Sequence, residues 1–197
     1  MALTESTMLP LGTTAPDFNL PDTVSGKIVT FDNAGGVQIP GMETPSIAGS
    51  EGTLVYFICN HCPYVIHTIE ELVRIAAEYQ QKGIGAVAIS SNDVERYPDD
   101  SPEKMRDFAH QYNFTFPYLY DESQAIARAY AAACTPDIYL FDAEGRLYYR
   151  GRLDGSRPGN DTPISGQDLR SALERLLAGI DAPEKQFPSA GCGIKWK

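Results

Sequence analysis

The chain has 197 residues, of which 43% are hydrophobic and 21% are charged. Its 26 acidic residues outnumber 16 basic ones, giving a formal net charge of −10, and a surface of this sign repels nucleic-acid phosphates and anionic lipids. We therefore expect neither a nucleic-acid nor a membrane partner. The first residues lack the basic and apolar segments of a signal peptide, so we expect a cytoplasmic location.

The first half of the chain predicts a β-α-β unit behind a small hairpin. Residues 16–31 have the pattern of two short strands around a turn, and 32–52 form an irregular connection. The apolar run 53–58 predicts a strand covered on both faces. From Cys62 to about Gln81, apolar residues recur at spacings of three and four, which predicts an amphipathic helix. A second apolar run follows and completes a right-handed unit with parallel strands.

The second half of the chain predicts further helices and strands in alternation. Cap residues open helices at 101–112, 121–130 and 165–177, the last two through the capping-box spacing. Strand-like runs occupy residues 116–120 and 137–151, and the second has the pattern of a hairpin. This order predicts an α/β fold with a mixed sheet flanked by helices.

Two of the four cysteines form the motif Cys59-Asn60-His61-Cys62, between the predicted strand and helix. A helix N-terminus stabilises a thiolate and lowers its pKa from about 8.5. We expect Cys59, nearer the exposed end, to attack a disulfide, and Cys62 to resolve the mixed disulfide. His61 supplies a cationic or hydrogen-bonding partner that tunes the thiolate pKa. The pair should then be more oxidising than thioredoxin, whose reduction potential is about −270 mV.

A CxxC pair can also form half of a structural zinc site, but such a site normally needs a second pair of ligands. The next cysteine lies 72 residues beyond Cys62. His67 and His110 are predicted to be solvated surface residues. We therefore favour redox chemistry, which needs no cofactor, and expect no metal.

Three segments resemble the thioredoxin superfamily, and within it the peroxiredoxin-like, AhpC/TSA-type branch that carries CxxC. APDFNLPDTVSGKIVTF resembles its N-terminal hairpin, LVYFICNHCPYV its active-site strand and helix, and ACTPDIYLFDAEGRLYYRGRLD its cis-proline loop and hairpin. The resemblance implies one thioredoxin-like domain over residues 1–197, with an N-terminal β-hairpin extension and a C-terminal tail. It also implies a cis bond between Thr135 and Pro136, facing Cys59. The Thr135 main chain would then be free to pair with an extended substrate.

The chain departs from the peroxidase pattern Pro-x-x-x-Thr/Ser-x-x-Cys. Counting back from Cys59 gives Tyr56 and Gly52, and counting back from Cys62 gives Cys59 and Val55. Neither count supplies the hydroxyl or the proline. We therefore predict a thiol-disulfide oxidoreductase that acts on a protein or small-molecule disulfide and is served by a cellular thiol reductant. A thiol-dependent peroxidase and a redox-sensing or metal-binding module without turnover are the alternatives.

The remaining two cysteines are isolated in the sequence. Cys134 immediately precedes the Thr-Pro pair, and Cys192 lies in the glycine-flanked tail SAGCGIKWK. A tail that folds back would make Cys134 and Cys192 a candidate second thiol pair, and two unrelated free thiols are an equally weighted alternative. A four-cysteine metal site that includes both ranks below these.

Two polar features carry less information. The acidic segment 92–105 is interpreted as a solvated face, with a substrate-selecting lip as the alternative. Arg150 and Arg152 are interpreted as surface charges. No buried carboxylate that could accept protons from the thiols can be assigned from the sequence.

Overall fold

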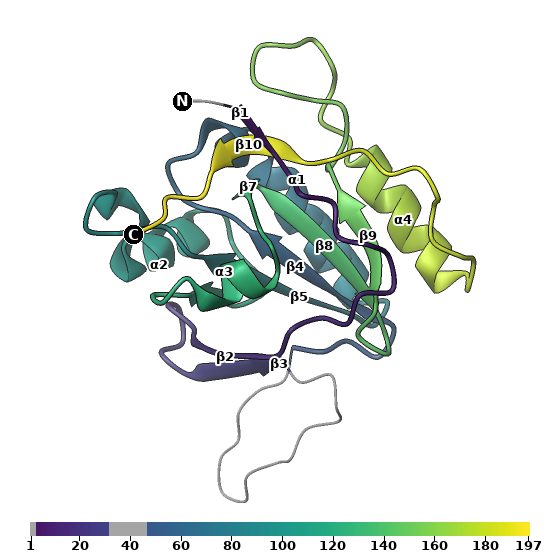
Figure 1. Cartoon of the computed structure of the whole chain (residues 1–197), viewed down its shortest axis with the longest axis horizontal. Coiled ribbons are helices and arrows are strands. Elements are labelled where there is room, and N and C mark those ends of the chain that lie inside the picture. The colour runs from purple at the N-terminus through teal and green to yellow at the C-terminus, as the bar shows by residue number, and fades with distance from the viewer. Residues whose placement is uncertain (1–2, 32–46) are drawn as a thin grey trace, which may run out of the picture.

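The computed structural model describes residues 3–31 and 47–197 and contains a central five-stranded sheet in the order β6-β5-β4-β8-β9 (Figure 1). The five strands are β4 (Gly52–Phe57), β5 (Ile84–Ser90), β6 (Tyr118–Tyr120), β8 (Asp137–Asp142) and β9 (Leu147–Gly151). β4, β5 and β6 are parallel, whereas β8 and β9 are antiparallel to their neighbours. The predicted mixed sheet is confirmed. Most of the predicted irregular connection, residues 32–46, lies outside the described residues.

Four α-helices and a short 3₁₀ helix, η1 (Pro98–Asp100), accompany this sheet in the described part of the chain. The α-helices are α1 (Pro63–Gln80), α2 (Pro102–Gln111), α3 (Ala125–Ala129) and α4 (Gln167–Leu177). The prediction for α1 is confirmed, with Cys62 as its N-cap residue. The prediction of a capping box at the start of α3 and of α4 is wrong. α3 and α4 follow the left-handed residues Gln124 and Gly166, and neither has a side-chain cap hydrogen bond. The carboxylate of Asp154 accepts the Gly166 N–H before α4 instead.

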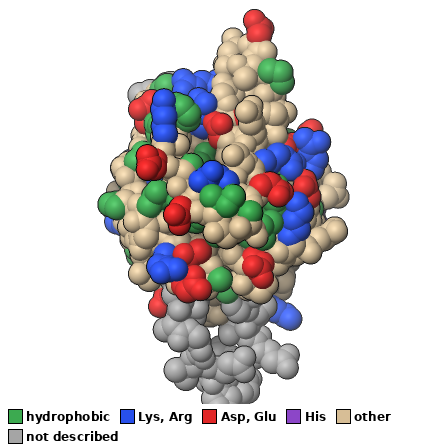
Figure 2. Space-filling model, turned by 90° about the vertical axis from the view of Figure 1, so that its right-hand side faces the viewer, with side chains coloured by type: hydrophobic (Ala, Val, Ile, Leu, Met, Phe, Trp, Pro, Cys, Tyr) green, Lys and Arg blue, Asp and Glu red, His purple; other side chains and the backbone are tan. Residues whose placement is uncertain are grey.

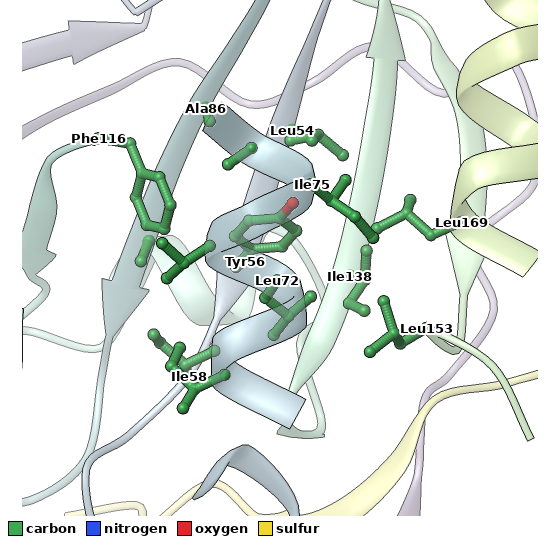
Figure 3. Close-up of a cluster of buried hydrophobic side chains, with 14 of the residues drawn as sticks. Leu54, Tyr56, Ile58, Leu72, Ile75, Ala86, Phe116, Ile138, Leu153 and Leu169 are labelled. Atoms are coloured by element: carbon green, nitrogen blue, oxygen red, sulfur yellow. The ribbon is translucent and has the colours of Figure 1, made fainter. Parts of the chain in front are cut away.

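Each face of the sheet carries a hydrophobic core, because the side chains of β4 alternate between them. Leu54 and Tyr56 are fully buried in the core beneath α1, beside Leu72 and Ile75 of that helix (Figure 3). Val55 and other side chains of β4 enter the opposite core. That core is covered by α3 and by the hairpin β2 (Phe18–Pro21) and β3 (Ile28–Phe31). Burial on both faces explains the continuous apolar run.

A second, three-stranded sheet has the order β1-β10-β7 and lies across the N-terminal end of α1 (Figure 1). Its strands are β1 (Leu3–Glu5), β7 (Cys134–Thr135) and β10 (Ala190–Gly193). The C-terminal segment β10 is the central strand and is antiparallel to both neighbours. β10 lies in the segment predicted to be a C-terminal tail, because a four-residue strand with two glycines has no alternating pattern.

Arg150 is fully buried, so its interpretation as a surface charge is wrong. Its guanidinium lies 3.0 Å from the Asp137 carboxylate and also donates to the main-chain oxygen of Ala131. The ion pair ties β9 to the start of β8, immediately after the Thr135-Pro136 bond.

The surface of the described residues is mixed in charge. Acidic and basic side chains are interspersed on the face shown in Figure 2. Within residues 3–31 and 47–197, no helix is both long enough and apolar enough to cross a membrane.

Candidate active site

The CxxC motif lies where β4 ends and α1 begins, so the fold presents both thiols at a helix N-terminus. Cys59 is 1% exposed and Cys62 is fully buried. The expectation that Cys59 stands at an exposed end is therefore wrong for this conformation. Asn60 and His61 are only partly buried and lie between the thiols and the surface.

Thr135 contacts both thiols, and the bond that follows it is cis, as predicted. Its hydroxyl lies 3.4 Å from the sulfur of Cys59. When Cys62 is protonated, its sulfur donates to the main-chain oxygen of Thr135, 3.1 Å away, and this one contact opposes ionisation of Cys62. Both active-site sulfurs thus contact the same residue, Thr135.

The main chain of Thr135 is not free, contrary to the sequence-based expectation. Thr135 is paired with Cys192 of β10, and Cys134 is paired with Gly193. The edge expected to receive an extended substrate is therefore occupied by the chain's own C-terminal strand.

The two active-site thiols titrate as a pair. The pKa of Cys62 is lowered to about 4, chiefly by the hydrogen bond from Cys59. Hydrogen bonds from Thr135, from Cys192 and from a backbone N–H of α1 add to this lowering. The pKa of Cys59 is raised well above its ordinary value by the same hydrogen bond, then by burial and by the charge of Asp100. One thiolate is therefore stabilised, and these contacts favour it on Cys62 rather than on Cys59, the predicted nucleophile.

A buried carboxylate, which sequence reasoning missed, lies beside the motif. Asp100 is fully buried, accepts the backbone N–H of Asn60 at 2.8 Å, and lies 2.8 Å from Nδ1 of His61. The side chain of Asn92 also donates to it at 2.8 Å. The segment interpreted as a solvated face therefore supplies a buried acid. The position of Asp100 just before the helix start at Ser101 is the one sequence feature that could have indicated its role. The other acidic residues of the segment give no way to single it out.

His61 is held on two sides. Its ring stacks on that of Tyr97, with 5.5 Å between the ring centroids and 6° between the planes. Its pKa is raised, first by the hydrogen bond with Asp100, while burial opposes the shift. The charge of the Cys62 thiolate also raises this pKa, so the imidazolium and the thiolate stabilise each other.

Comparison with known proteins places these residues in a family. The model of the AhpC/TSA family matches residues 11–150. The chain belongs to the AhpC/TSA family. A crystal structure of an uncharacterized conserved protein from Geobacillus kaustophilus is 48% identical to it, with a TM-score of 0.90, and the match covers 100% of this chain and 97% of that one.

More distant matches agree with the expected fold. The thiol-disulfide oxidoreductase ResA of Geobacillus thermodenitrificans is 26% identical over 147 residues, which cover 73% of this chain and 70% of ResA. A putative thioredoxin from Neisseria meningitidis has a TM-score of 0.60 at 22% identity, over 86% of this chain and 93% of that one. The fold is thioredoxin-like.

This AhpC/TSA chain lacks the Thr or Ser hydroxyl of the peroxidase pattern three residues before Cys59, where Tyr56 stands. Gly52 stands at the start of β4, and Tyr56 is fully buried in the core beneath α1. Burial raises the pKa of the Tyr56 hydroxyl, which keeps it neutral.

The candidate pair of Cys134 and Cys192 is not formed, and the strand register explains why. Cys192 lies opposite Thr135, so its side chain shares that residue's face of the sheet, whereas Cys134 points to the other face. The thiol of Cys134 is directed to the main-chain oxygen of Pro136 at 3.6 Å, and burial raises its pKa. All four cysteines are free thiols in this structure.

His67 also differs from its prediction. It is partly buried and lines a pocket beside Pro136, rather than standing on a solvated face. Arg152 lines the same pocket and pairs with Asp168 at 2.6 Å. His110 is exposed, as predicted.

Donor atoms of Cys59, His61 and Asp100 lie within 4.8 Å of one another. A thiolate, an imidazole and a carboxylate are donor types that zinc uses. The contact of His61 with Asp100 accounts for much of this convergence without an ion.

Proposed function

We propose that the protein is a thiol-disulfide oxidoreductase that cycles Cys59 and Cys62 between dithiol and disulfide. The observation that carries the proposal is the convergence of both sulfurs on Thr135 at the N-terminus of α1, with one thiolate strongly stabilised. Family membership supports it, as does the name of the relative ResA.

In the proposed reaction, the proton of Cys59 moves to Cys62 along the hydrogen bond between them. The Cys59 thiolate attacks one sulfur of a substrate disulfide, and the other sulfur leaves as a thiolate that takes up a proton. Cys62 then loses its proton and attacks the sulfur of Cys59. This releases the second substrate thiol and leaves a disulfide between Cys59 and Cys62.

His61, backed by Asp100, exchanges protons in this scheme: its imidazolium gives a proton to the leaving substrate thiolate, and the neutral ring then takes up the proton of Cys62. A donor atom of each lies within 4.8 Å of the Cys59 sulfur, and Asn92 and the Asn60 N–H fix the carboxylate. His61 exchanges the proton, and Asp100, which holds the ring at Nδ1, is a positioning residue.

The proposed substrate is a protein or small-molecule disulfide, and a cellular thiol reductant restores the dithiol. Because Cys59 is 1% exposed, a disulfide reaches its sulfur only when the side chains above it move. We also propose a reducing compartment such as the cytoplasm, since four cysteines in 197 residues are too few for a disulfide-stapled secreted fold.

Differential alkylation and peptide mapping across a glutathione redox series test the proposal. We expect a reversible disulfide between Cys59 and Cys62 with a defined potential, lost in both Cys59→Ser and Cys62→Ser. Cys134→Ser is the matched control and should retain it. If Cys59 and Cys62 stay unpaired at every glutathione ratio, the exchange mechanism is wrong.

A metal-binding module is the second candidate, because three donor types converge around Cys59. It predicts stoichiometric zinc in the purified protein and loss of zinc in Asp100→Asn. Zinc-free protein that exchanges disulfides would exclude it. A peroxidase would instead turn over hydroperoxide with a sulfenic acid at Cys59.

A further inference from the structure

A third thiol lies against the active-site pair. Cys192 of β10 is 3% exposed and belongs to the same core cluster as Cys59 and Cys62. It hydrogen-bonds to Cys62, and Cys62 also hydrogen-bonds to Cys59. Cys192 is paired directly opposite Thr135, and the main-chain oxygen of Thr135 lies 3.1 Å from the sulfur of Cys62. Cys192 and Cys62 therefore meet at the same residue.

The fold holds Cys192 at this place. β10 is paired on one side with β7, where Cys192 faces Thr135, and on the other with β1, where it faces Leu3. Gly191 allows the close approach of β10 to β7, because a Cβ there would collide with the main-chain oxygen of Thr135. The thiol thus sits in a central strand, fixed from both sides, on the face of Thr135 that touches the active site.

We propose that Cys192 is a third redox cysteine, which exchanges with the Cys59–Cys62 disulfide at the sulfur of Cys62. This inference rests on the proposed function, because it starts from that disulfide. The Cys192 thiol loses its proton and attacks the Cys62 sulfur. The bond between Cys62 and Cys59 breaks, and its electron pair leaves on Cys59, which takes up the proton. No electrons enter or leave the protein.

The product carries a Cys62–Cys192 disulfide and a free Cys59. The new bond ties β10 covalently to the start of α1 and returns the proposed nucleophile to its thiol form while the protein keeps its oxidising equivalent. Burial and the neighbouring Cys62 charge raise the pKa of Cys192 to about 12 in the dithiol form. Once Cys62 is in a disulfide, its charge is gone, so oxidation itself makes Cys192 a better nucleophile.

The test isolates Cys62 and Cys192 by removing Cys59. Full-length Cys59→Ser protein is treated with oxidised glutathione, quenched with acid, and analysed by intact mass and non-reducing peptide mapping. Glutathione adds to Cys62, and Cys192 should displace it to give a Cys62–Cys192 crosslink. Since an intramolecular thiol acts at an effective concentration of millimolar or more, the glutathione adduct should be at least ~10-fold lower than in Cys59→Ser/Cys192→Ser. Cys59→Ser/Cys134→Ser should behave like Cys59→Ser.

Equal glutathione adducts with and without Cys192, or a Cys62–Cys134 crosslink, would overturn the inference. Wild-type protein gives a second measurement should the Cys59→Ser protein not fold. Its map should contain Cys62–Cys192 beside Cys59–Cys62, and Cys192→Ser should lose only the first. A wild-type map with Cys59–Cys62 alone refutes the third redox cysteine and leaves the proposed function intact. A map with neither disulfide overturns both.

Discussion

The carboxylate of Asp100 lies 2.8 Å from Nδ1 of His61 and accepts the backbone N–H of the preceding Asn60 at the same distance. A side chain forty positions away in the sequence therefore fixes the two central residues of the CxxC motif. This contact raises the pKa of His61 and brings a negative charge toward Cys59. The pH dependence of the thiol pair should consequently depend on Asp100.

Asp100→Asn should move the pH profile of disulfide exchange to lower pH. Without the carboxylate, the pKa of His61 falls toward its ordinary value near 6.5. The pKa of Cys59 should fall as well, because the charge that raises it is gone. The measurement is the exchange rate with a small disulfide across pH. Asp99→Asn is the matched control, since the Asp99 side chain is exposed and its only active-site contact is a main-chain oxygen. Equal shifts in both variants would contradict the assignment.

The same contact predicts a component of stability that depends on pH. Because the folded pKa of His61 is raised, its pairing with Asp100 contributes stability fully below about pH 6.5, the unfolded value, and loses it as pH rises through the folded pKa. Thermal unfolding of wild type and Asp100→Asn should therefore differ more at low pH than at high pH. A difference that grows with pH would have the wrong sign.

Thr135→Val should raise the pKa of the single stabilised thiolate. The Thr135 side chain hydrogen-bonds to both active-site sulfurs and lowers the pKa of each. A hydrogen bond to a charged group contributes roughly 1.5–3 kcal/mol, which corresponds to about 1–2 pKa units. Ultraviolet titration of wild type should show one thiolate forming well below the ordinary pKa range of cysteine, because the Cys62 pKa is lowered and those of the other three cysteines are raised.

Thr135→Ser is the conservative control for this titration, because it keeps the hydroxyl and should titrate like wild type. If valine and serine shift the titration equally, the effect comes from packing, and the hydroxyl does not stabilise the thiolate.

Arg150→Met should destabilise the fold by about 3–5 kcal/mol, because it leaves Asp137 as an uncompensated buried charge. Chemical denaturation measures this loss. Arg150→Met/Asp137→Asn should recover much of it, since the carboxamide is neutral. Arg146→Met is a suitable control, because its ion pairs are at the surface and contribute little. Loss of similar size in the control would contradict the argument.

The sequence predicted the parts of the site that are local in the chain. The CxxC motif sits between a strand and a helix whose periods are clear, so the placement of Cys59 and Cys62 at the start of α1 could be read directly. The cis bond before Pro136 could be predicted only from the resemblance to a known family. Arg150 was misjudged because it stands in a strand that is buried on both faces, where an arginine needs a partner such as Asp137.

The parts that sequence missed depend on tertiary contacts. Asp100 is one acid among several in its segment, and only the packing of that segment against Asn60 and His61 buries it. The position of Cys192 follows from strand pairing across the chain ends, with β1 on one side and β7 on the other. A four-residue strand such as β10 is too short to show the alternation of apolar and polar residues from which its pairing could be predicted.

The last prediction concerns the reduction potential of the Cys59–Cys62 pair, which should lie between about −270 mV and about −120 mV. Stabilising a thiolate stabilises the reduced form, and the pKa of Cys62 is lowered to about 4. The imidazolium of His61 contributes through its attraction to that thiolate. His61→Phe keeps a ring to stack on Tyr97 but removes the charge, so its potential should be more negative, by roughly 30 mV for each tenfold change in the equilibrium constant. His67→Phe, which replaces a histidine of α1 outside the motif, is the matched control. Equilibration with glutathione measures all three proteins. A wild-type potential more negative than that of thioredoxin, or equal potentials for wild type and His61→Phe, would show that the thiolate is not stabilised in this way.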